Sequence, residues 1–335
     1  MDLVRPKIRD FAAEVLAQGG MTSPARRHLG RLVIVTFHRV LPEQFRSRYH
    51  IPGIVVTPEE LDWTIRYLRR SYTIGRLDHV HGRHEAGDAP SKPFVAITFD
   101  DGYADNFTYA RPILEKHGVK ATFFVPAAFI GRERLPWYDS LGFALSPASR
   151  RTEVERGLLA RHDLGHVADA EPQTIIEAAK RIRPHVRQAL VEAIRPSRIP
   201  AWARTMSAEE IVSLALEGHE IGAHTMTHPI LNTCDDASLD WELRGSKSLL
   251  EKLIGREVTS LAYPNGDQDA RVLRAVRTAG FQRAVTTHWG TNPRGQERLL
   301  LNRCDIDARR MRNLSGELSE SNLALRLSGL HPGLR

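Results

Sequence analysis

The stretch Phe94-Val95-Ala96-Ile97-Thr98-Phe99-Asp100-Asp101-Gly102 decides how the fold is interpreted. Its first six residues form a hydrophobic run, as expected of a strand that is covered on both faces. Two adjacent carboxylates and a glycine follow, and neighbouring side chains in a strand point to opposite faces. Both aspartates can therefore serve one site only where the strand ends and turns, which Gly102 permits. The carboxyl ends of parallel strands are also where α/β barrels place their active sites.

A second motif, His224-Thr225-Met226-Thr227-His228-Pro229, follows another short strand. Two histidines four residues apart can approach one ion where the backbone is helical or tightly turned. A zinc protease would carry glutamate immediately after the first histidine, but Thr225 stands there, so any base must come from elsewhere. Taken alone, this motif is compatible with two exposed loop histidines, and the aspartates with an Asp-Gly turn before a helix that starts at Asp105.

Together the two motifs indicate more than either one does. Two histidines and one aspartate make a three-ligand metal site with an open position for water, as hydrolytic metal centres require. The remaining aspartate can then take a proton from that water.

Strand-like and helical segments alternate along most of the chain. The expected strands are Leu32–Phe37, Phe94–Phe99, Ala121–Val125, Glu220–Gly222, Thr259–Ala262, Arg283–Thr286 and Leu301–Ile306. Thr57-Pro58-Glu59-Glu60 and Ser207-Ala208-Glu209-Glu210 are capping boxes that start helices. Buried strands alternating with helices predict a parallel α/β layer or barrel.

Three regions depart from this alternation. Residues from about 132 to 206 are helical and strongly charged, and we interpret them as an insertion on the barrel rim, either a wall of the substrate groove or a packing element. Residues 1–30 form an N-terminal helical segment whose apolar stripe favours covering an open barrel end, with contact to an anionic membrane as the alternative. The barrel itself is expected over residues 31–310, and residues 311–335 as a C-terminal tail.

The sequence resembles the polysaccharide deacetylase family, also called the NodB-homology domain or carbohydrate esterase family 4. Thr98-Phe99-Asp100-Asp101-Gly102 matches the first motif of that family, and His224-Thr225-x-x-His228-Pro229 matches the second. The resemblance covers roughly Arg31 to Asp307 apart from the insertion. It implies an α/β fold, a distorted (β/α)7-type barrel, that removes acetyl groups from N-acetylated sugars. By the same resemblance Asp100 is the base, while Asp101, His224 and His228 bind the metal.

The third motif departs from the commonest family pattern, in which an arginine stands two residues before a proline. Here the segment is Ala262-Tyr263-Pro264-Asn265-Gly266, which resembles a Tyr-Pro-x-Gly subgroup acting on exopolysaccharides and poly-N-acetylglucosamine. Ala262 cannot orient the base, so Arg303 is the candidate substitute, with a surface ion pair as its simpler interpretation. The backbone N–H of Asn265 is the expected oxyanion donor.

The general acid has two candidates. His38 follows the strand Leu32–Phe37 and precedes Arg39-Val40, a stretch that resembles the N-terminal motif of the same subgroup. A histidine at the end of a strand can titrate near neutrality and protonate a leaving amine. His331, in Leu327-Ser328-Gly329-Leu330-His331, superficially matches the C-terminal motif of the family but lies far beyond the last expected strand. We therefore favour His38.

Composition excludes several classes of protein. The chain has 335 residues, of which 41% are hydrophobic and 26% charged, which is typical of globular proteins rather than disordered or polytopic membrane proteins. Two cysteines, Cys234 and Cys304, cannot form a disulfide framework. The net charge of +7 is spread along the chain, so no nucleic-acid partner is expected. The N-terminus lacks a signal-peptide pattern, which predicts a cytoplasmic or membrane-associated protein, or an extracytoplasmic one if an export segment is missing.

The expected function is hydrolysis of the acetamide of N-acetylhexosamine units in a polysaccharide or glycan precursor, releasing acetate. Zinc is the default ion for two histidines and an aspartate, although cobalt, nickel or manganese can occupy such a site. Two alternatives remain open: a metal-dependent hydrolase of a small non-glycan amide or ureide, and a catalytically inactive glycan-binding protein. The complete set of Asp100, Asp101, His224 and His228 argues against the inactive protein.

Overall fold

The computed structural model describes residues 4–88, 90–131, 135–196 and 199–330. Seven parallel strands form its centre: β1 (Arg31–Phe37), β5 (Phe94–Phe99), β6 (Thr122–Val125), β7 (Glu220–Ala223), β8 (Ser260–Ala262), β9 (Arg283–Trp289) and β11 (Leu301–Asp305). Strand β1 pairs with β5 along Leu32–Phe37 and with β11 at Val35 and Thr36, so the strands close into a barrel. This confirms the expected distorted (β/α)7-type barrel and each of its seven strands.

Short strands complete the sheet at the seam where the barrel closes. Strand β4 (Thr73–Gly75) pairs in parallel with the first half of β5, and β10 (Asn292–Pro293) pairs antiparallel with the start of β1. A separate ribbon is formed by β2 (Arg39–Val40) and β3 (Val55–Val56). These strands have two or three residues each, too few to produce a recognisable alternation in the sequence.

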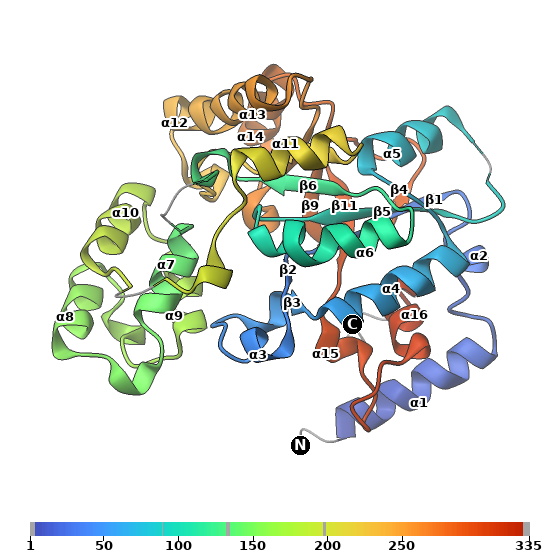
Figure 1. Ribbon diagram of the computed structural model, residues 1–335, viewed down its shortest axis with the longest axis horizontal. Coiled ribbons are helices and arrows are strands. Elements are labelled where there is room, and N and C mark those ends of the chain that lie inside the picture. Colours follow the sequence, from blue (N-terminus) through green and yellow to red (C-terminus); the bar gives the residue numbers. More distant parts are fainter. Residues whose placement is uncertain (1–3, 89, 132–134, 197–198, 331–335) are drawn as a thin grey trace.

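Helices surround the barrel (Figure 1). The helices that follow or precede barrel strands are α4 (Pro58–Ser71), α6 (Arg111–Lys116), α11 (Ala208–Leu216), α13 (Ser246–Ile254) and α14 (Ala270–Thr278). Shorter helices are α2 (Pro24–Arg27), α3 (Glu43–Arg46), α12 (Asp236–Asp240) and α15 (Ala308–Met311). Both expected capping boxes are present, because Thr57 accepts from the backbone of Glu60 and Ser207 from that of Glu210.

The amino end of the barrel is plugged by α5 (Leu77–Ala86), not by the N-terminal helix. Leu77 and Val80 share a buried cluster with barrel-interior residues such as Ile34 and Phe124. The N-terminal helix α1 (Val4–Gln18) instead lies against α16 (Glu320–Ser328), where Asn322 Nδ2 donates to Asp10 Oδ1 at 3.0 Å. The expectation that the N-terminal segment covers a barrel end was therefore wrong, because helix α5, which follows β4, already fills the amino end.

Two further findings concern the ends of the chain. The segment expected as a C-terminal tail contains helix α16, which places Leu323 and Leu327 in the main hydrophobic core. Residues 331–335 of that segment lie outside the described residues. On α1, Ile8, Phe11 and Val15 are exposed, and the membrane contact considered for this helix stays a prediction. No helix in the described ranges combines the length and apolar character needed to cross a lipid bilayer.

The segment between β6 and α11 is helical and packs around a core of its own. It contains α7 (Trp137–Ala144), α8 (Glu153–Arg161), α9 (Pro172–Ala179) and α10 (Pro184–Ala193), which stand beside the barrel in Figure 1. Its buried cluster includes Leu141, Leu159 and Ile176, and Tyr103 joins that cluster from the barrel side. We call residues 135–203 of the described chain the insertion.

Candidate metal centre and active site

The motif residues meet at the carboxyl end of the barrel. Asp100 and Asp101 follow β5, and His224 follows β7, which is separated from β5 in the sheet by β6 alone. His228 returns to the same place from the loop after β7. The hydrophobic runs therefore end where the polar side chains converge, as the barrel fold requires.

Asp101, His224 and His228 form a cluster that fits a metal ion. Asp101 Oδ1 lies 3.5 Å from His224 Nε2 and 3.4 Å from His228 Nε2. All three ligand atoms lie within 4.8 Å of one another. Donors held at zinc–nitrogen distances in a tetrahedral site would be separated by about 3.3 Å, close to these values.

Hydrogen bonding leaves the donor atoms of this cluster available. His224 Nδ1 lies 2.7 Å from the carbonyl oxygen of Ala262. Since a carbonyl can only accept, Nδ1 carries a proton, and in the neutral imidazole Nε2 presents its lone pair to the cluster. Asp101 Oδ1 is buried and has no hydrogen-bond partner among the described residues. A buried carboxylate oxygen without a partner is costly, and a bound cation would satisfy it.

The electrostatics of the cluster follow from its burial and its neighbours. Burial by itself raises the pKa of Asp101, but His224 and His228 outweigh it and hold that pKa below its ordinary value. Burial lowers the pKa of His228 to about 3, and the nearby His224 contributes to the same shift. Near neutral pH, Asp101 is therefore a carboxylate and His228 a neutral imidazole, the forms in which both bind metals.

Asp100 forms an ion pair with Arg303 of β11, a strand that β1 separates from β5 in the closed barrel. Arg303 Nη1 donates to Asp100 Oδ1 at 2.8 Å, and Arg303 Nη2 lies 2.8 Å from Oδ2, so the pair is bidentate. Arg303 Nε donates to the carbonyl oxygen of Thr286, which fixes the guanidinium plane. Burial raises the pKa of Asp100, but Arg303 and His224 lower it below its ordinary value. The structure thus places Arg303 where an orienting arginine is needed and not in a surface ion pair.

The two candidates for the general acid differ in what can be said of them. His38 follows β1, and its Nε2 lies 3.9 Å from Asp100 Oδ2. Its side chain is 28% exposed, so it faces the opening of the site and not the barrel core. Its backbone carbonyl accepts a 2.8 Å hydrogen bond from Asn106 Nδ2, which anchors the residue. His331 lies outside the described residues.

Asn265 stands on the rim just after β8. It is exposed and has a φ of +59°, a conformation that few residues other than glycine adopt. Its carbonyl oxygen accepts from Thr287 Oγ1 at 2.9 Å, and its side-chain oxygen accepts from Lys180 Nζ of the insertion at 3.1 Å. Asn265 lies three residues after Ala262, whose carbonyl oxygen orients the His224 ring. The same turn after β8 therefore carries Asn265 and positions one of the three potential metal ligands.

Backbone strain concentrates at this site. Five described residues other than glycine have a positive φ, and four of them are Asp101 (+70°), Thr225 (+65°), His228 (+58°) and Asn265 (+59°). Thr225 is β-branched, for which this conformation is especially unfavourable. Such strain persists only where surrounding contacts impose it, and it is characteristic of functional sites.

The site residues assigned from the sequence leave out three residues that hold the second motif. Glu242 is buried and accepts from the backbone N–H groups of Met226 and Thr227, at 2.7 and 2.9 Å. From the insertion, Trp137 Nε1 donates to the carbonyl oxygen of His228 at 3.2 Å, and the Tyr138 ring lies edge-on to the His228 ring. The Trp137-Tyr138 pair was a visible signal at the start of the insertion, whereas nothing in the sequence distinguishes Glu242 from other helical glutamates.

Fold and site place the protein among (β/α) barrels that gather three potential metal ligands and a separate carboxylate at one rim. The chain belongs to the polysaccharide deacetylase family, whose model matches residues 87–284, more than half of its length.

Curated relatives include a candidate polysaccharide deacetylase of Bacillus subtilis, YxkH, which is 25% identical over 65% of this chain and 53% of its own length. A chitooligosaccharide deacetylase of Rhizobium leguminosarum bv. trifolii is 25% identical over 34% of this chain and 55% of its own. The chain thus spans about half the length of these two relatives.

Solved structures show the same fold. The Streptococcus pyogenes deacetylase PplD, in complex with acetate, has a TM-score of 0.59 at 18% identity, covering 89% of this chain and 98% of that one. IcaB from Ammonifex degensii has a TM-score of 0.58 at 16% identity, covering 90% and 99%.

Proposed function

We propose that this protein is a metal-dependent deacetylase that hydrolyses the acetamide of N-acetylhexosamine units in a glycan and releases acetate. One observation supports this above all others. In a chain of the polysaccharide deacetylase family, a buried donor cluster of Asp101, His224 and His228 adjoins a second carboxylate, Asp100, that Arg303 holds in a bidentate pair.

Asp101, His224 and His228 would hold the metal ion, which supplies Lewis-acid polarisation at the reacting centre. Zinc suits two imidazoles and a carboxylate, and cobalt, nickel or manganese are possible occupants. Three protein donors leave a coordination position open, as catalytic sites of this kind need.

The chain's own residues divide the proton transfers. Asp100 accepts a proton from the attacking water as the oxygen of that water bonds to the acetamide carbon. Arg303 keeps Asp100 ionised and aligned, and the backbone N–H of Asn265 donates to the developing oxyanion. His38 donates a proton to the nitrogen as the carbon–nitrogen bond breaks, so that acetate and a free amino sugar leave.

We propose that the substrate is a polymer containing N-acetylglucosamine, of the exopolysaccharide class. The Tyr263-Pro264-Asn265-Gly266 segment supports this assignment, since it resembles the subgroup that acts on such polymers. The Rhizobium relative, named as a chitooligosaccharide deacetylase, supports the same class of sugar.

The test is acetate release from N-acetylglucosamine oligomers, with and without a chelator, followed by metal re-addition. We expect the chelator to abolish acetate release and zinc to restore it. His224→Ala should lose both bound metal and activity. His79→Ala, which alters an exposed histidine on α5 at the opposite barrel end, should retain both.

Two results would contradict the proposal. Acetate release that is insensitive to chelator would exclude metal dependence. Metal binding without acetate release from any glycan, together with hydrolysis of small amides, would favour the non-glycan hydrolase instead.

A further inference from the structure

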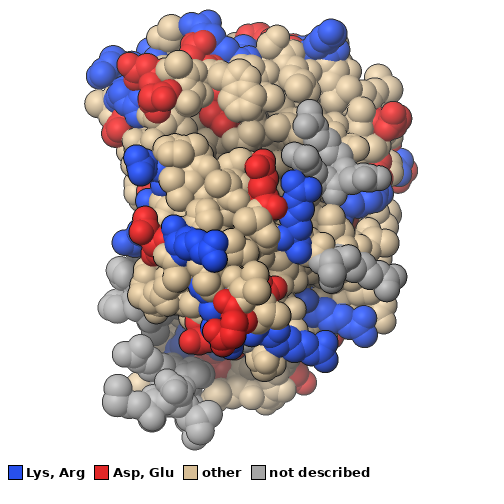
Figure 2. All heavy atoms as spheres, turned by 90° about the vertical axis from the view of Figure 1, so that its left-hand side faces the viewer, with Lys and Arg blue, Asp and Glu red and all other residues tan. Residues whose placement is uncertain are grey.

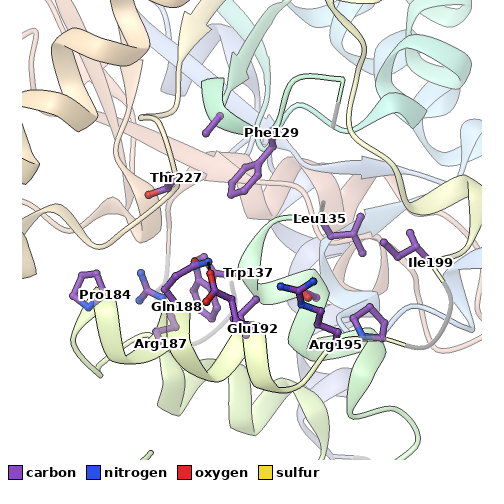
Figure 3. Close-up of a pocket in the computed structure, with 14 residues that line it drawn as sticks. Phe129, Leu135, Trp137, Pro184, Arg187, Gln188, Glu192, Arg195, Ile199 and Thr227 are labelled. Carbon is purple, nitrogen blue, oxygen red and sulfur yellow. Dashed lines mark hydrogen bonds between the residues drawn. The ribbon is translucent and has the colours of Figure 1, made fainter. Parts of the chain in front are cut away.

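A pocket of about 640 Å³ lies between the insertion and the barrel rim, beside the metal cluster. Figure 3 shows the side chains of α10 along one side of it, with Phe129 and Thr227 of the barrel loops opposite. Thr227 lies between the two metal-binding histidines in the chain. Trp137, which also lines the pocket, donates to the carbonyl oxygen of His228. The pocket therefore adjoins the reacting centre and is separate from its donor atoms.

One side chain in this pocket is a buried arginine that forms no direct ion pair with a described carboxylate. Arg187 is only 4% exposed, and its guanidinium carbon lies 4.3 Å from the centre of the Trp137 ring. Its Nη1 atom is buried and has no hydrogen-bond partner among the described residues. The carboxylate of Glu242 acts on it electrostatically without forming a direct ion pair. Removing a guanidinium from water without pairing it is costly, so such a residue is rare unless a ligand supplies the partner.

Arg151, the other buried arginine of the insertion, provides a comparison within the same segment. Arg151 donates from Nη1 to the carbonyl oxygens of Ala168 and Ala170 and from Nη2 to that of Leu145. These bonds tie together the loops around α8, which is a structural role. Arg151 lacks a hydrogen-bond partner only at Nε, whereas no side-chain nitrogen of Arg187 donates to a described residue. The structural role of Arg151 therefore has no counterpart at Arg187.

The positive charge of Arg187 is not part of a broad basic surface. Burial lowers the pKa of Arg187 to about 10, which still leaves the group protonated near neutral pH. The face of the molecule that carries the insertion shows basic and acidic side chains intermixed (Figure 2), so no broad positive surface explains this residue. Arg195, an exposed residue just after the end of α10, lines the same pocket. Glu192, which lies between the two arginines in the chain, accepts a hydrogen bond from Gln188.

We propose that this pocket binds an anionic group, a carboxylate or a sulfate ester, on a sugar adjacent to the one that is deacetylated. The inference rests on the proposed function and narrows its substrate to acidic glycans. The planar guanidinium offers paired donors that match a carboxylate or sulfate, and its contact with the Trp137 ring holds it in place.

The first experiment compares kcat/KM for acetate release from three oligosaccharides of equal length. One is neutral N-acetylglucosamine oligomer, one alternates N-acetylglucosamine with glucuronate, and one carries sulfate esters. We expect the wild type to prefer at least one acidic substrate, and Arg187→Met to reduce that preference about tenfold, the effect of losing a charged hydrogen bond. Arg187→Lys should retain part of it. Arg183→Met, at the exposed start of α10, is the matched control and should keep the wild-type ratio.

Preference for only one acidic substrate would identify the anion. Equal kcat/KM for all three substrates, or a preference that survives in Arg187→Met, would overturn the inference.

A second experiment separates this inference from the proposed function. Calorimetric titration of the acidic oligosaccharides into the metal-free protein measures binding without catalysis. We expect binding that weakens about tenfold in Arg187→Met and is unchanged in Arg183→Met. Absence of binding by every acidic oligosaccharide to a folded protein would reject the pocket as an anion site, whatever the acetate assay shows.

Discussion

The barrel and the insertion both bury an arginine beside the active site, but they differ in how its charge is balanced. Arg303 of the barrel is paired with Asp100 through two hydrogen bonds, whereas Arg187 of the insertion has no carboxylate partner among the described residues. A paired charge is stabilised before any substrate arrives. An unpaired one is complementary to a charge that the substrate brings. The difference suggests a division of labour in which the barrel performs the chemistry and the insertion recognises the glycan.

Asp100→Asn is expected to have the largest effect, and it tests whether the barrel performs the chemistry. An amide cannot accept the proton of the attacking water, so acetate release should fall by about 10²–10⁴-fold. Bound metal, measured by elemental analysis, should remain, because Asp101, His224 and His228 are unchanged. Retention of activity within a few-fold would show that Asp100 is not the base.

Replacing each arginine by methionine compares the two regions directly through the free energy of unfolding. Arg303→Met leaves a buried carboxylate unpaired and should destabilise the protein by about 3–5 kcal/mol. Arg187→Met removes a buried charge that has no direct ion pair and keeps an apolar side chain against the Trp137 ring, so it should leave stability unchanged or raise it. Chemical denaturation of both variants measures the contrast. An equally large loss in Arg187→Met would mean that the insertion needs this charge for its own folding.

The features that could be predicted from the sequence are those that depend on residues close together in the chain. The strands β1, β5 and β6 were predictable because each is a short apolar run, and the polar β9 and β11 were predictable from their place in the alternation with helices. Asp100 and His224 directly follow strands. The pairing of Arg303 with Asp100 crosses 203 residues, so the sequence could suggest it only through resemblance to a family. The unpartnered state of Arg187 depends on every neighbour that packs around it. The small strands β2, β3, β4 and β10 were missed because their backbone pairs without a readable hydrophobic pattern.

His38→Ala tests the barrel's catalytic role at the solvent-exposed opening of the active site. Loss of the general acid should lower kcat by about 10²-fold while metal content stays unchanged. The effect should be smaller for substrates with an activated leaving group, because these need less protonation. A fall in kcat for His331→Ala, with His38→Ala unaffected, would reverse the assignment of the acid.

The smallest effect is expected at Glu220, at the amino end of the barrel far from the chemistry. Its Oε2 accepts from Thr122 Oγ1 at 2.7 Å and from the Asp78 backbone N–H at 2.9 Å, and its Oε1 accepts from Ser260 Oγ. Burial raises the pKa of Glu220, and the neighbouring Asp78 contributes to the same shift. Charging this carboxyl therefore costs more in the folded than in the unfolded chain, and the cost grows as pH rises above the ordinary glutamate value.

Glu220→Gln tests this pH dependence without touching the active site. The glutamine can accept the same two bonds through its oxygen and donate to Ser260, so the barrel should close as before. Relative to wild type, its melting temperature should rise progressively from pH 4 towards neutrality, while kcat at neutral pH stays the same. A melting-temperature difference that is constant with pH would show that Glu220 is not titrating in the folded state. A large loss of kcat would instead show that Glu220, at the amino end of the barrel, affects the active site at the carboxyl end. That result would contradict the separation of stability and chemistry between the two ends.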